Sequence, residues 1–340
     1  MESFSPVRVV APAVEILDQT ELPAREVWRR IDTVDAMCEA IATLRVRGAP
    51  LLGTCGMAGV AIAAEERGVR DEELRYAAEE IAATRPTAVE LSWGAGKALE
   101  AALGVARERR RALLWELTRE HMERRLREDL ALGRHGAALL AGGSAVLTHC
   151  NAGALASGGI GTALGVIRVA HEDGRLERCY ATETRPLLQG ARLTAWELAR
   201  AGIPASLVPD TAAAALIASG KVQAVITGAD RIATNGDSAN KIGTYGLAVV
   251  AARHRVPFYI AAPRTTIDPG CGSGAGIPIE FRPEEEVAGF GGQRWSPEGI
   301  GAYNPAFDVT PAELISAIIT ERGVARPPYE RSLAELLAQP

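Results

Sequence analysis

A single cysteine stands where an apolar run meets a glycine-rich turn. Cys150 follows residues 144–148 (SAVLT) and precedes five glycines between residues 153 and 165. At such a junction, backbone N–H groups and the positive end of a following helix favour a thiolate and attract an anion such as phosphate. A free cysteine is also commonly a small buried hydrophobic residue. Both interpretations of Cys150, functional thiol or packing residue, are open at this point.

A carboxyl group follows a second apolar run. Asp230 comes directly after residues 222–229 (VQAVITGA), and Asn240 and Lys241 follow within fourteen residues. An apolar cleft favours the protonated form of a carboxyl and suits it to general acid–base catalysis, whereas an aspartate at a junction commonly caps the next segment. Lys241 offers a phosphate a point charge and Asn240 offers it an amide. The closeness of these groups favours the functional interpretation of Asp230.

Two arginines lie at breaks in helical sequence. Arg47 precedes Gly48, Ala49 and a proline, and Arg85 precedes another proline. A guanidinium at such a break can bind a phosphate or sugar hydroxyls. Surface arginines are common, so neither is convincing alone.

The elements that carry these residues fall into two groups. Helical periodicity in the first third predicts helices over residues 33–44, 50–66, 71–83, 87–107 and 111–132. We therefore predict a smaller, mainly helical N-terminal domain over residues 1–133. Its boundary lies at the glycine-containing segment 133–143.

The remainder alternates short apolar runs with helical stretches. Strands are expected at 145–148, 178–181, 205–208, 224–226 and 258–261, and helices at 161–170, 190–201, 212–219 and 242–254. This α/β alternation predicts a Rossmann-like, doubly wound parallel sheet over residues 134–340. Residues 310–313 (TPAE) have the form of a capping box with proline at the first helical position, and predict a last helix.

Ligands of an open parallel sheet bind outside the carboxyl ends of its strands. The polar residues expected at the strand ends and in the loops just beyond them are Cys150, Thr182, Glu183, Arg185, Gln189, Asp210, Asp230, Asn240 and Lys241.

Composition argues against several classes of protein. The net charge is −5 and no face-wide basic excess is present, so we expect no nucleic-acid partner. No stretch of about twenty apolar residues exists, so no membrane span is expected. The start of the chain lacks the features of a signal peptide, and five scattered cysteines suit a reducing cytoplasm. The dispersed histidines and cysteines show no metal-ligand spacing, so no metal is expected.

Long motifs in this sequence match one known family. They are VRGAPLLG, TRPTAV, THCNAGALASGGIGTALGVI, ETRPLLQGARLTAWEL, TGADRIATNGDSANKIGTYGLAV and YNPAFDVTPAELISAIITERG, in this order. From about Val14 to Gly323 the chain resembles the methylthioribose-1-phosphate isomerases of methionine salvage. These enzymes are related to the regulatory subunits of translation initiation factor 2B.

The resemblance implies an aldose–ketose isomerase without metal or nucleotide cofactor. It would convert 5-methylthio-D-ribose 1-phosphate to 5-methylthio-D-ribulose 1-phosphate as a homodimer, in a site between the two domains. The motifs carry over Cys150 and Asp230 as catalytic residues. They carry over as substrate-binding residues Arg47, Gly48, Ala49, Arg85, Gln189, Asn240 and Lys241.

The chain departs from the family pattern at a few positions. Thr182 replaces an acid, Leu51 and Leu52 replace alanine and isoleucine, Glu90 replaces asparagine and Thr265 a common serine. These changes leave the C5 substituent of the sugar open, so 5-deoxyribose 1-phosphate and ribose 1,5-bisphosphate are alternative substrates.

Two further functions compete. A near-match to the dinucleotide fingerprint at residues 159–165, with Glu183 some twenty residues on, suggests an NAD-dependent oxidoreductase. A non-enzymatic regulatory subunit of the translation-factor 2B type is the other. Retention of both Cys150 and Asp230 argues against this second alternative.

Overall fold

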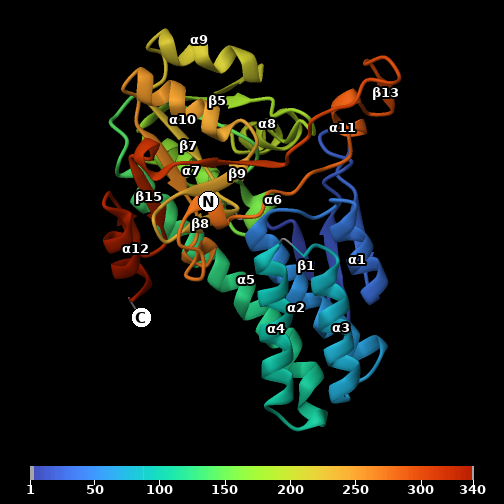
Figure 1. Ribbon diagram of the computed structural model, residues 1–340. Helices are drawn as coiled ribbons and strands as arrows, with labels where there is room; N and C mark the ends of the chain where they lie inside the picture. The colour runs from blue at the N-terminus through green and yellow to red at the C-terminus, as the bar shows by residue number, and fades with distance from the viewer. Residues whose placement is uncertain (1–3, 87, 339–340) are drawn as a thin grey trace. The chain divides into compact units, whose positions relative to one another are not determined.

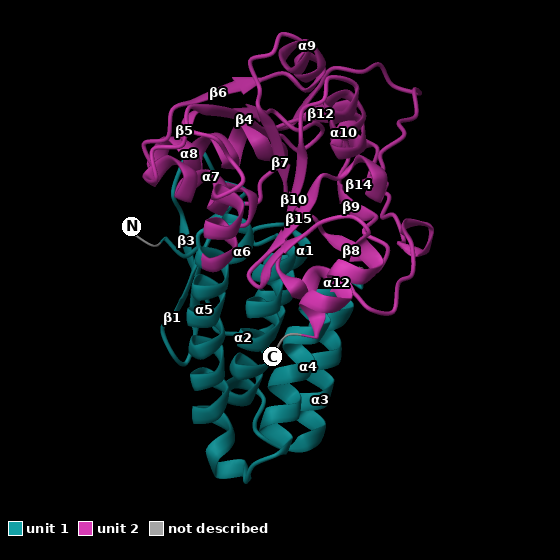
Figure 2. Ribbon diagram, turned by 90° about the vertical axis from the view of Figure 1, so that its left-hand side faces the viewer, with its two compact units in different colours: residues 1–130, 153–161 teal, residues 131–152, 162–340 magenta. Residues whose placement is uncertain are grey.

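The computed structural model describes residues 4–86 and 88–338, and the chain divides into two compact units (Figure 2). Unit 1 comprises Met1–Leu130 and Gly153–Gly161, and unit 2 comprises Ala131–Ala152 and Thr162–Pro340. The predicted boundary between residues 133 and 134 falls inside a helix, α5 (Arg107–Ala137).

Unit 1 begins with a small antiparallel sheet of β1 (Val7–Val9), β2 (Val14–Leu17) and β3 (Trp28–Ile31), in that order. These strands were not predicted. Each has only three or four residues, too few for an alternating pattern to stand out in sequence.

Helices make up the rest of unit 1 (Figure 1). The predicted helices are confirmed as α1 (Val34–Ala42), α2 (Ala49–Glu66), α3 (Asp71–Ala83), α4 (Val89–Leu103) and α5, with shifted ends. Thr33 caps α1, since its hydroxyl oxygen accepts from the Ala36 N–H at 3.2 Å. Residue 87, the expected start of α4, lies outside the described residues. A short helix, α6 (Ala154–Ser157), also belongs to this unit.

A seven-stranded sheet forms the centre of unit 2. Its strands are β4 (Ser144–Thr148), β5 (Leu176–Thr182), β6 (Ala205–Val208), β7 (Ala224–Thr227), β10 (Phe258–Ala261), β15 (Ala317–Thr320) and β16 (Gly323–Ala325). Their order is β16-β15-β10-β7-β4-β5-β6, and all pairs are parallel except β15 with β16.

The chain therefore runs from β4 outward through β5 and β6, and returns to β7 on the other side of β4. This is the Rossmann strand order, and the predicted fold class is confirmed. Right-handed crossovers place α7 (Ala163–Glu172) and α8 (Ala195–Arg200) on one face. They place α9 (Ala213–Ala218) and α10 (Thr244–Arg253) on the other (Figures 1 and 2).

The helix predicted from residue 310 is wrong. Residues Ala312–Leu314 form a single 3₁₀ turn between β14 (Phe307–Thr310) and β15. The following residues, AIIT, are fully buried beside β10. Pairing inside the sheet outweighs the local capping signal, because it buries an entire apolar strand. A helix does follow later, α12 (Tyr329–Leu337).

The structure also corrects the segment that carries Asn240 and Lys241, which we expected to be a loop. They lie in a strand, β9 (Ser238–Lys241), of a second sheet with the order β11-β8-β9-β14. Its other strands are β8 (Arg231–Ala233) and β11 (Ile267–Asp268). The β8–β9 hairpin turns at Gly236, whose φ of +93° favours glycine. A further helix, α11 (Glu285–Ala288), precedes a two-stranded hairpin of β12 (Gly289–Phe290) and β13 (Gln293–Arg294).

Candidate active site

Cys150 and Asp230 both lie just beyond the carboxyl ends of strands, at the same edge of the large sheet. Cys150 follows β4 and Asp230 follows β7, which are neighbouring parallel strands with Thr148 opposite Ile226. The turns beyond them touch, because a Cβ on Gly228 would lie 2.9 Å from the Cβ of Ala152. The gap between β4 and β7 is the point where the strand order reverses, and there doubly wound sheets bind their ligands.

The backbone of Cys150 is held in an unusual conformation. Its φ of +60° is left-handed, which costs a non-glycine residue roughly 1–2 kcal/mol. Hydrogen bonds on both sides hold it there. The Cys150 N–H donates to Thr184 Oγ1 at 2.9 Å, and Thr194 Oγ1 donates to the Cys150 carbonyl at 2.5 Å. Such constraints accumulate at functional sites.

Asp230 is positioned by its backbone. Its N–H donates to the Ala239 carbonyl at 2.9 Å, which places it beside Asn240. The structure leaves Asp230 exposed, and exposure by itself does not favour the protonated form of the carboxyl. The residue stands three positions past the end of β7, beyond the apolar side chains of that strand.

Asn240 and Lys241 are consecutive buried residues of β9. Asn240 Nδ2 donates to Thr244 Oγ1 at 3.0 Å. The Lys241 side chain is 8% exposed, and its ammonium lies 5.1 Å from the ring centroid of Phe307. No carboxylate in the described part of the chain forms an ion pair with it. A buried ammonium of this kind is suited to an anionic ligand.

Gln189 has an unsatisfied acceptor. The residue is 7% exposed, and no donor among the described residues reaches its Oε1. Gly190 fixes its position, because a Cβ there would lie 1.7 Å from the Thr182 carbonyl oxygen at the end of β5. A buried acceptor without a donor is costly, and a sugar hydroxyl would satisfy it.

The remaining predicted residues lie in unit 1. Gly48 precedes α2 with a φ of +99°, and a Cβ there would lie 2.5 Å from the Ala156 carbonyl oxygen. Arg47 Nε donates to Gln19 Oε1 at 3.0 Å, and Gln19 Nε2 donates to the Leu155 carbonyl at 2.8 Å. Sequence reasoning missed Gln19, because nothing in its local pattern marks it.

Arg85 lies at the same end of unit 1 as Arg47 and Ala49. It precedes α4, and α4 starts beside the start of α2, since Gly94 and Gly53 are in direct backbone contact. Unit 1 thus groups Arg47, Gly48, Ala49 and Arg85, and unit 2 groups the other predicted site residues.

The sequence suggested that the N–H groups of the glycine-rich turn bind a phosphate. In the structure these groups have partners within the protein instead. Gly161 N–H donates to Asp129 Oδ2 at 3.0 Å, and Gly159 N–H donates to Ser157 Oγ at 3.1 Å. Ser157 Oγ donates to the same carboxylate at 2.5 Å, and Arg125 donates to its other oxygen. The carboxylate of Asp129 therefore occupies the place of an anionic ligand, which also argues against dinucleotide binding.

Two other strand-end candidates have structural roles. The Asp210 carboxylate accepts from the N–H groups of Thr184 at 2.8 Å and Arg185 at 2.6 Å. The Arg185 guanidinium donates to the Val287 carbonyl at 2.9 Å and stacks over Trp295. These contacts brace the turn after β5.

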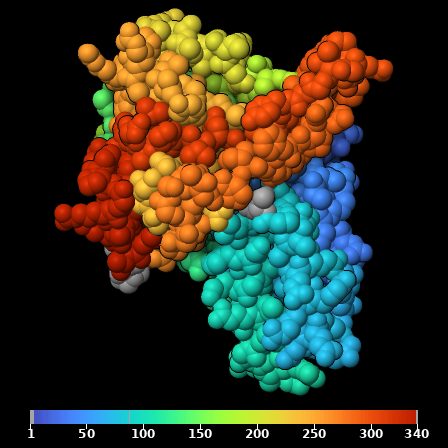
Figure 3. All heavy atoms as spheres, viewed as in Figure 1, coloured from blue at the N-terminus to red at the C-terminus, as the bar shows by residue number. Residues whose placement is uncertain are grey.

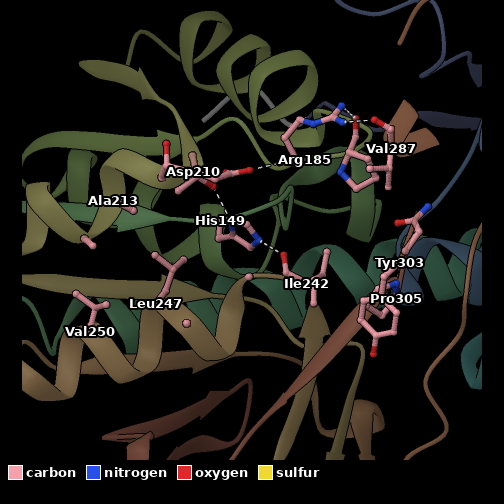
Figure 4. Close-up of a pocket in the computed structure, with 17 residues that line it drawn as sticks. His149, Arg185, Asp210, Ala213, Ile242, Leu247, Val250, Val287, Tyr303 and Pro305 are labelled. Atoms are coloured by element: carbon pink, nitrogen blue, oxygen red, sulfur yellow. Dashed lines mark hydrogen bonds between the residues drawn. The ribbon is translucent and has the colours of Figure 1, made fainter. Parts of the chain in front are cut away.

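A cavity of about 480 Å³ opens beside this turn (Figure 4). His149, Arg185, Asp210 and the α10 residues Leu247 and Val250 are among the residues that line it. The predicted catalytic and substrate-binding residues do not line it, although its wall includes the neighbours of Cys150 and Lys241.

Residues 4–86 and 88–338 also bear on metal binding and membrane insertion. There, no group of three histidine, cysteine or acidic side chains is arranged to hold a metal ion. None of the helices in these residues has the length and apolar character needed to cross a membrane.

The chain is similar to known proteins over most of its length. The model of the initiation factor 2 subunit family matches residues 45–327. A methylthioribose-1-phosphate isomerase of Pelotomaculum thermopropionicum is 49% identical, over 94% of this chain and 90% of that protein. A 5-deoxyribose 1-phosphate isomerase of Moorella thermoacetica is 48% identical, over 99% and 98%.

Two solved structures superimpose on this chain, one named as an isomerase and the other as a translation factor. The 5-methylthioribose 1-phosphate isomerase of Pyrococcus horikoshii superimposes with a TM-score of 0.92 at 41% identity, covering 98% of this chain and 95% of that one. A structure from A. fulgidus described as translation initiation factor eIF-2B, subunit delta, has a TM-score of 0.89 at 41% identity, covering 99% and 100%.

Proposed function

Because this chain belongs to the initiation factor 2 subunit family, we propose that it is an aldose–ketose isomerase acting on 5-methylthio-D-ribose 1-phosphate. The product is 5-methylthio-D-ribulose 1-phosphate. The observation that supports this most is the position of Cys150 and Asp230 at adjacent strand ends, on the switch point of the sheet.

The phosphate on C1 determines what the enzyme must do. It replaces the anomeric hydroxyl, whose proton a free aldose loses when its ring opens, so here the ring oxygen must receive a proton as its bond to C1 breaks. In this proposal, a protonated Asp230 gives its proton to the ring oxygen as that bond breaks. The Asp230 carboxyl is exposed, and its protonated form is favoured only when water is excluded from it. In this proposal the bound sugar excludes that water.

The hydrogen on C2 then moves to C1 while the C2 hydroxyl loses its proton and becomes the ketone. In one route Cys150 removes the C2 hydrogen as a proton and returns it to C1. In the other the hydrogen passes directly as a hydride, and Cys150 orients the substrate. Both routes balance, because the Asp230 carboxylate that remains after the first step takes up the proton of the C2 hydroxyl and is thereby regenerated.

The other residues bind the substrate in this proposal. The unpaired ammonium of Lys241 attracts the phosphate, as do the guanidinium groups of Arg47 and Arg85. Gln189 Oε1 and the Asn240 amide take sugar hydroxyls, which gives the buried acceptor of Gln189 its missing donor.

The test is a panel of 5-substituted ribose 1-phosphates followed by NMR for ketose formation. We expect conversion of the methylthio compound. Cys150→Ala and Asp230→Asn should lower kcat by about 10²–10⁴-fold with unchanged circular dichroism. Cys38→Ser, at a half-buried cysteine on α1, is the matched control and should retain activity. Full activity of Asp230→Asn would contradict the assignment of the acid.

A second substrate is favoured by one observation. The Moorella relative named as a 5-deoxyribose 1-phosphate isomerase matches 99% of this chain. The departures at Leu51 and Leu52 do not help to choose, since both side chains are buried in the core of unit 1. The ratio of kcat/KM for the two sugars in the same panel separates the substrates. Absence of all turnover, together with a stable complex with a translation factor, would favour the regulatory-subunit alternative.

We also propose that the protein is a cytoplasmic homodimer. Its five cysteines are free thiols, as a reducing compartment allows. Seven large apolar side chains of unit 2 are exposed: Leu207, Tyr245, Val249, Phe281, Trp295, Ile300 and Tyr303. Tyr303 has the largest exposed fraction of these, 80%. The segment around β12 and β13 projects from unit 2 (orange in Figure 3). Among the exposed apolar side chains, the rings of Phe281 and Tyr303 lie in contact at a centroid distance of 5.4 Å, and exposed aromatic pairs of this kind are common in protein interfaces.

A further inference from the structure

His149, the residue before Cys150, uses both of its ring nitrogens. It is 3% exposed, with Nδ1 at 2.6 Å from Thr182 Oγ1 and Nε2 at 2.8 Å from the Ile242 carbonyl (Figure 4). The backbone of Gly243 packs directly against the ring, because a Cβ on Gly243 would lie 3.2 Å from the imidazole of His149. The ring therefore connects the ends of β4 and β5 to the residues that follow Lys241.

The carbonyl of Ile242 fixes the direction of every hydrogen bond in this group. A carbonyl only accepts, so Nε2 carries the proton and Nδ1 is an acceptor. Thr182 must then donate its hydroxyl proton to Nδ1, which leaves its oxygen free to accept from Thr184 Oγ1 at 3.2 Å. The other acceptor for Thr184, the Thr182 carbonyl, is more distant at 3.4 Å.

The same chain of bonds ends at the catalytic cysteine. Thr184 Oγ1 accepts the Cys150 N–H at 2.9 Å. Donors thus run in one direction, from Cys150 N–H through Thr184 and Thr182 to His149, and from His149 to Ile242. All five groups are uncharged, provided that the imidazole is neutral.

The surroundings keep the imidazole neutral. Burial lowers the pKa of His149, and the nearby charge of Lys241 lowers it further. The hydrogen bond to Ile242 and the charge of Asp210 act in the opposite direction but do not reverse the shift. A neutral ring is what the chain of bonds requires, because a doubly protonated ring has no acceptor for Thr182.

We propose that His149 is a positioning residue with two separable effects. Through Nδ1 and the hydroxyls of Thr182 and Thr184 it holds the left-handed backbone of Cys150, and through Nε2 it holds the segment that follows Lys241. The inference rests on the proposed roles of these two residues. If His149 only filled space in the core, substitutions that remove one of its two hydrogen bonds would not separate an effect on Cys150 from an effect on the segment after Lys241.

Two substitutions of His149 separate the effects. His149→Gln keeps a donor for Ile242 but removes the acceptor for Thr182, so kcat should fall by roughly 10–100-fold with KM changed less than about threefold. His149→Asn keeps an acceptor for Thr182 but loses the donor to Ile242, so KM should rise about tenfold with a smaller change in kcat. Circular dichroism and the thermal midpoint show whether each variant is folded.

Substitutions of Thr182 test the hydroxyl chain without changing the histidine. Thr182→Val removes the hydroxyl at constant shape and should lower kcat as His149→Gln does, whereas Thr182→Ser should restore at least half of it. Thr227→Val is the matched control. Thr227 is a fully buried threonine at the end of β7, and its hydroxyl has no partner in the described residues.

A second readout is independent of the substrate. The rate at which iodoacetamide alkylates Cys150, measured by peptide mass spectrometry, should change at least fivefold in Thr182→Val, while the Cys38 peptide should not change. A changed alkylation rate with unaltered turnover would support the positioning role and contradict the catalytic role of Cys150. Unchanged kcat, KM and alkylation in folded His149→Gln and Thr182→Val would overturn the inference.

Discussion

His121 shows how strongly burial acts on one side chain. It lies on α5 with 4% exposure, and its ring packs against Trp93 at a centroid distance of 5.7 Å. Arg124 donates to Nδ1 at 2.8 Å, and Nε2 has no partner among the described residues. Burial, with the nearby charges of Arg125 and Arg124, lowers the pKa of His121 to about 3.

This shift predicts an acid-sensitive stability. In the unfolded chain a histidine takes up its proton near pH 6.5, while folded His121 stays neutral down to about pH 3. Its contribution to stability is therefore present above pH 6.5 and is lost as the pH falls toward 3. Between pH 7 and 4 the wild type should lose about 3 kcal/mol more than His121→Phe.

Urea unfolding at pH 7, 5 and 4, followed by tryptophan fluorescence, measures this difference. The exposed residue His254 provides the control, and His254→Gln should keep the pH slope of the wild type. Equal slopes for the wild type and His121→Phe would show that His121 is not the acid-sensitive group.

At the scale of elements, the contact between α2 and α4 depends on two glycines. A Cβ on Gly94 of α4 would lie 2.1 Å from the carbonyl oxygen of Gly53, and a Cβ on Gly56 of α2 would lie 2.5 Å from the carbonyl oxygen of Leu91, so the two backbones touch. Helices approach this closely only where neither has a side chain at the crossing. The start of α2, which carries Arg47, Gly48 and Ala49 into position, is held by this contact.

Gly94→Ala should therefore separate the helices. We expect it to destabilise the protein by roughly 1–3 kcal/mol and to raise the KM for the sugar phosphate, because the start of α2 shifts. Gly96→Ala in the same helix is the matched control. A Cβ there meets nothing within 4 Å, so this variant should gain roughly 1 kcal/mol. Thermal unfolding and KM measure both effects, and equal behaviour of the two variants would refute the close-crossing argument.

At the scale of the whole molecule, the exposed apolar side chains of unit 2 predict self-association. Sedimentation should give twice the chain mass of 35.9 kDa. The double variant Val249→Glu with Tyr303→Glu should be monomeric, because charges in an apolar interface stay unpaired when it forms. Tyr76→Glu changes an exposed tyrosine of unit 1 and should remain dimeric. A monomeric wild type would rule out the homodimer.

The sequence alone determined the elements whose signal is local. The periodicity of the first third was enough for α1–α5, and the alternation of apolar runs with helices was enough for the main parallel strands. It also singled out Cys150 and Asp230, because a thiol or carboxyl directly after an apolar run is visible without knowing what lies beside it.

The tertiary structure decided everything that depends on distant partners. The capping signal at residue 310 failed because β15 pairs with β10, about sixty residues earlier. The glycine turn is satisfied by Asp129, and His149 reaches Ile242, 93 positions away. The place of β4 and β7 as neighbours is likewise a property of the sheet. Local periodicity records which face of an element is buried, whereas strand order and hydrogen-bond partners are fixed only when distant segments pack together.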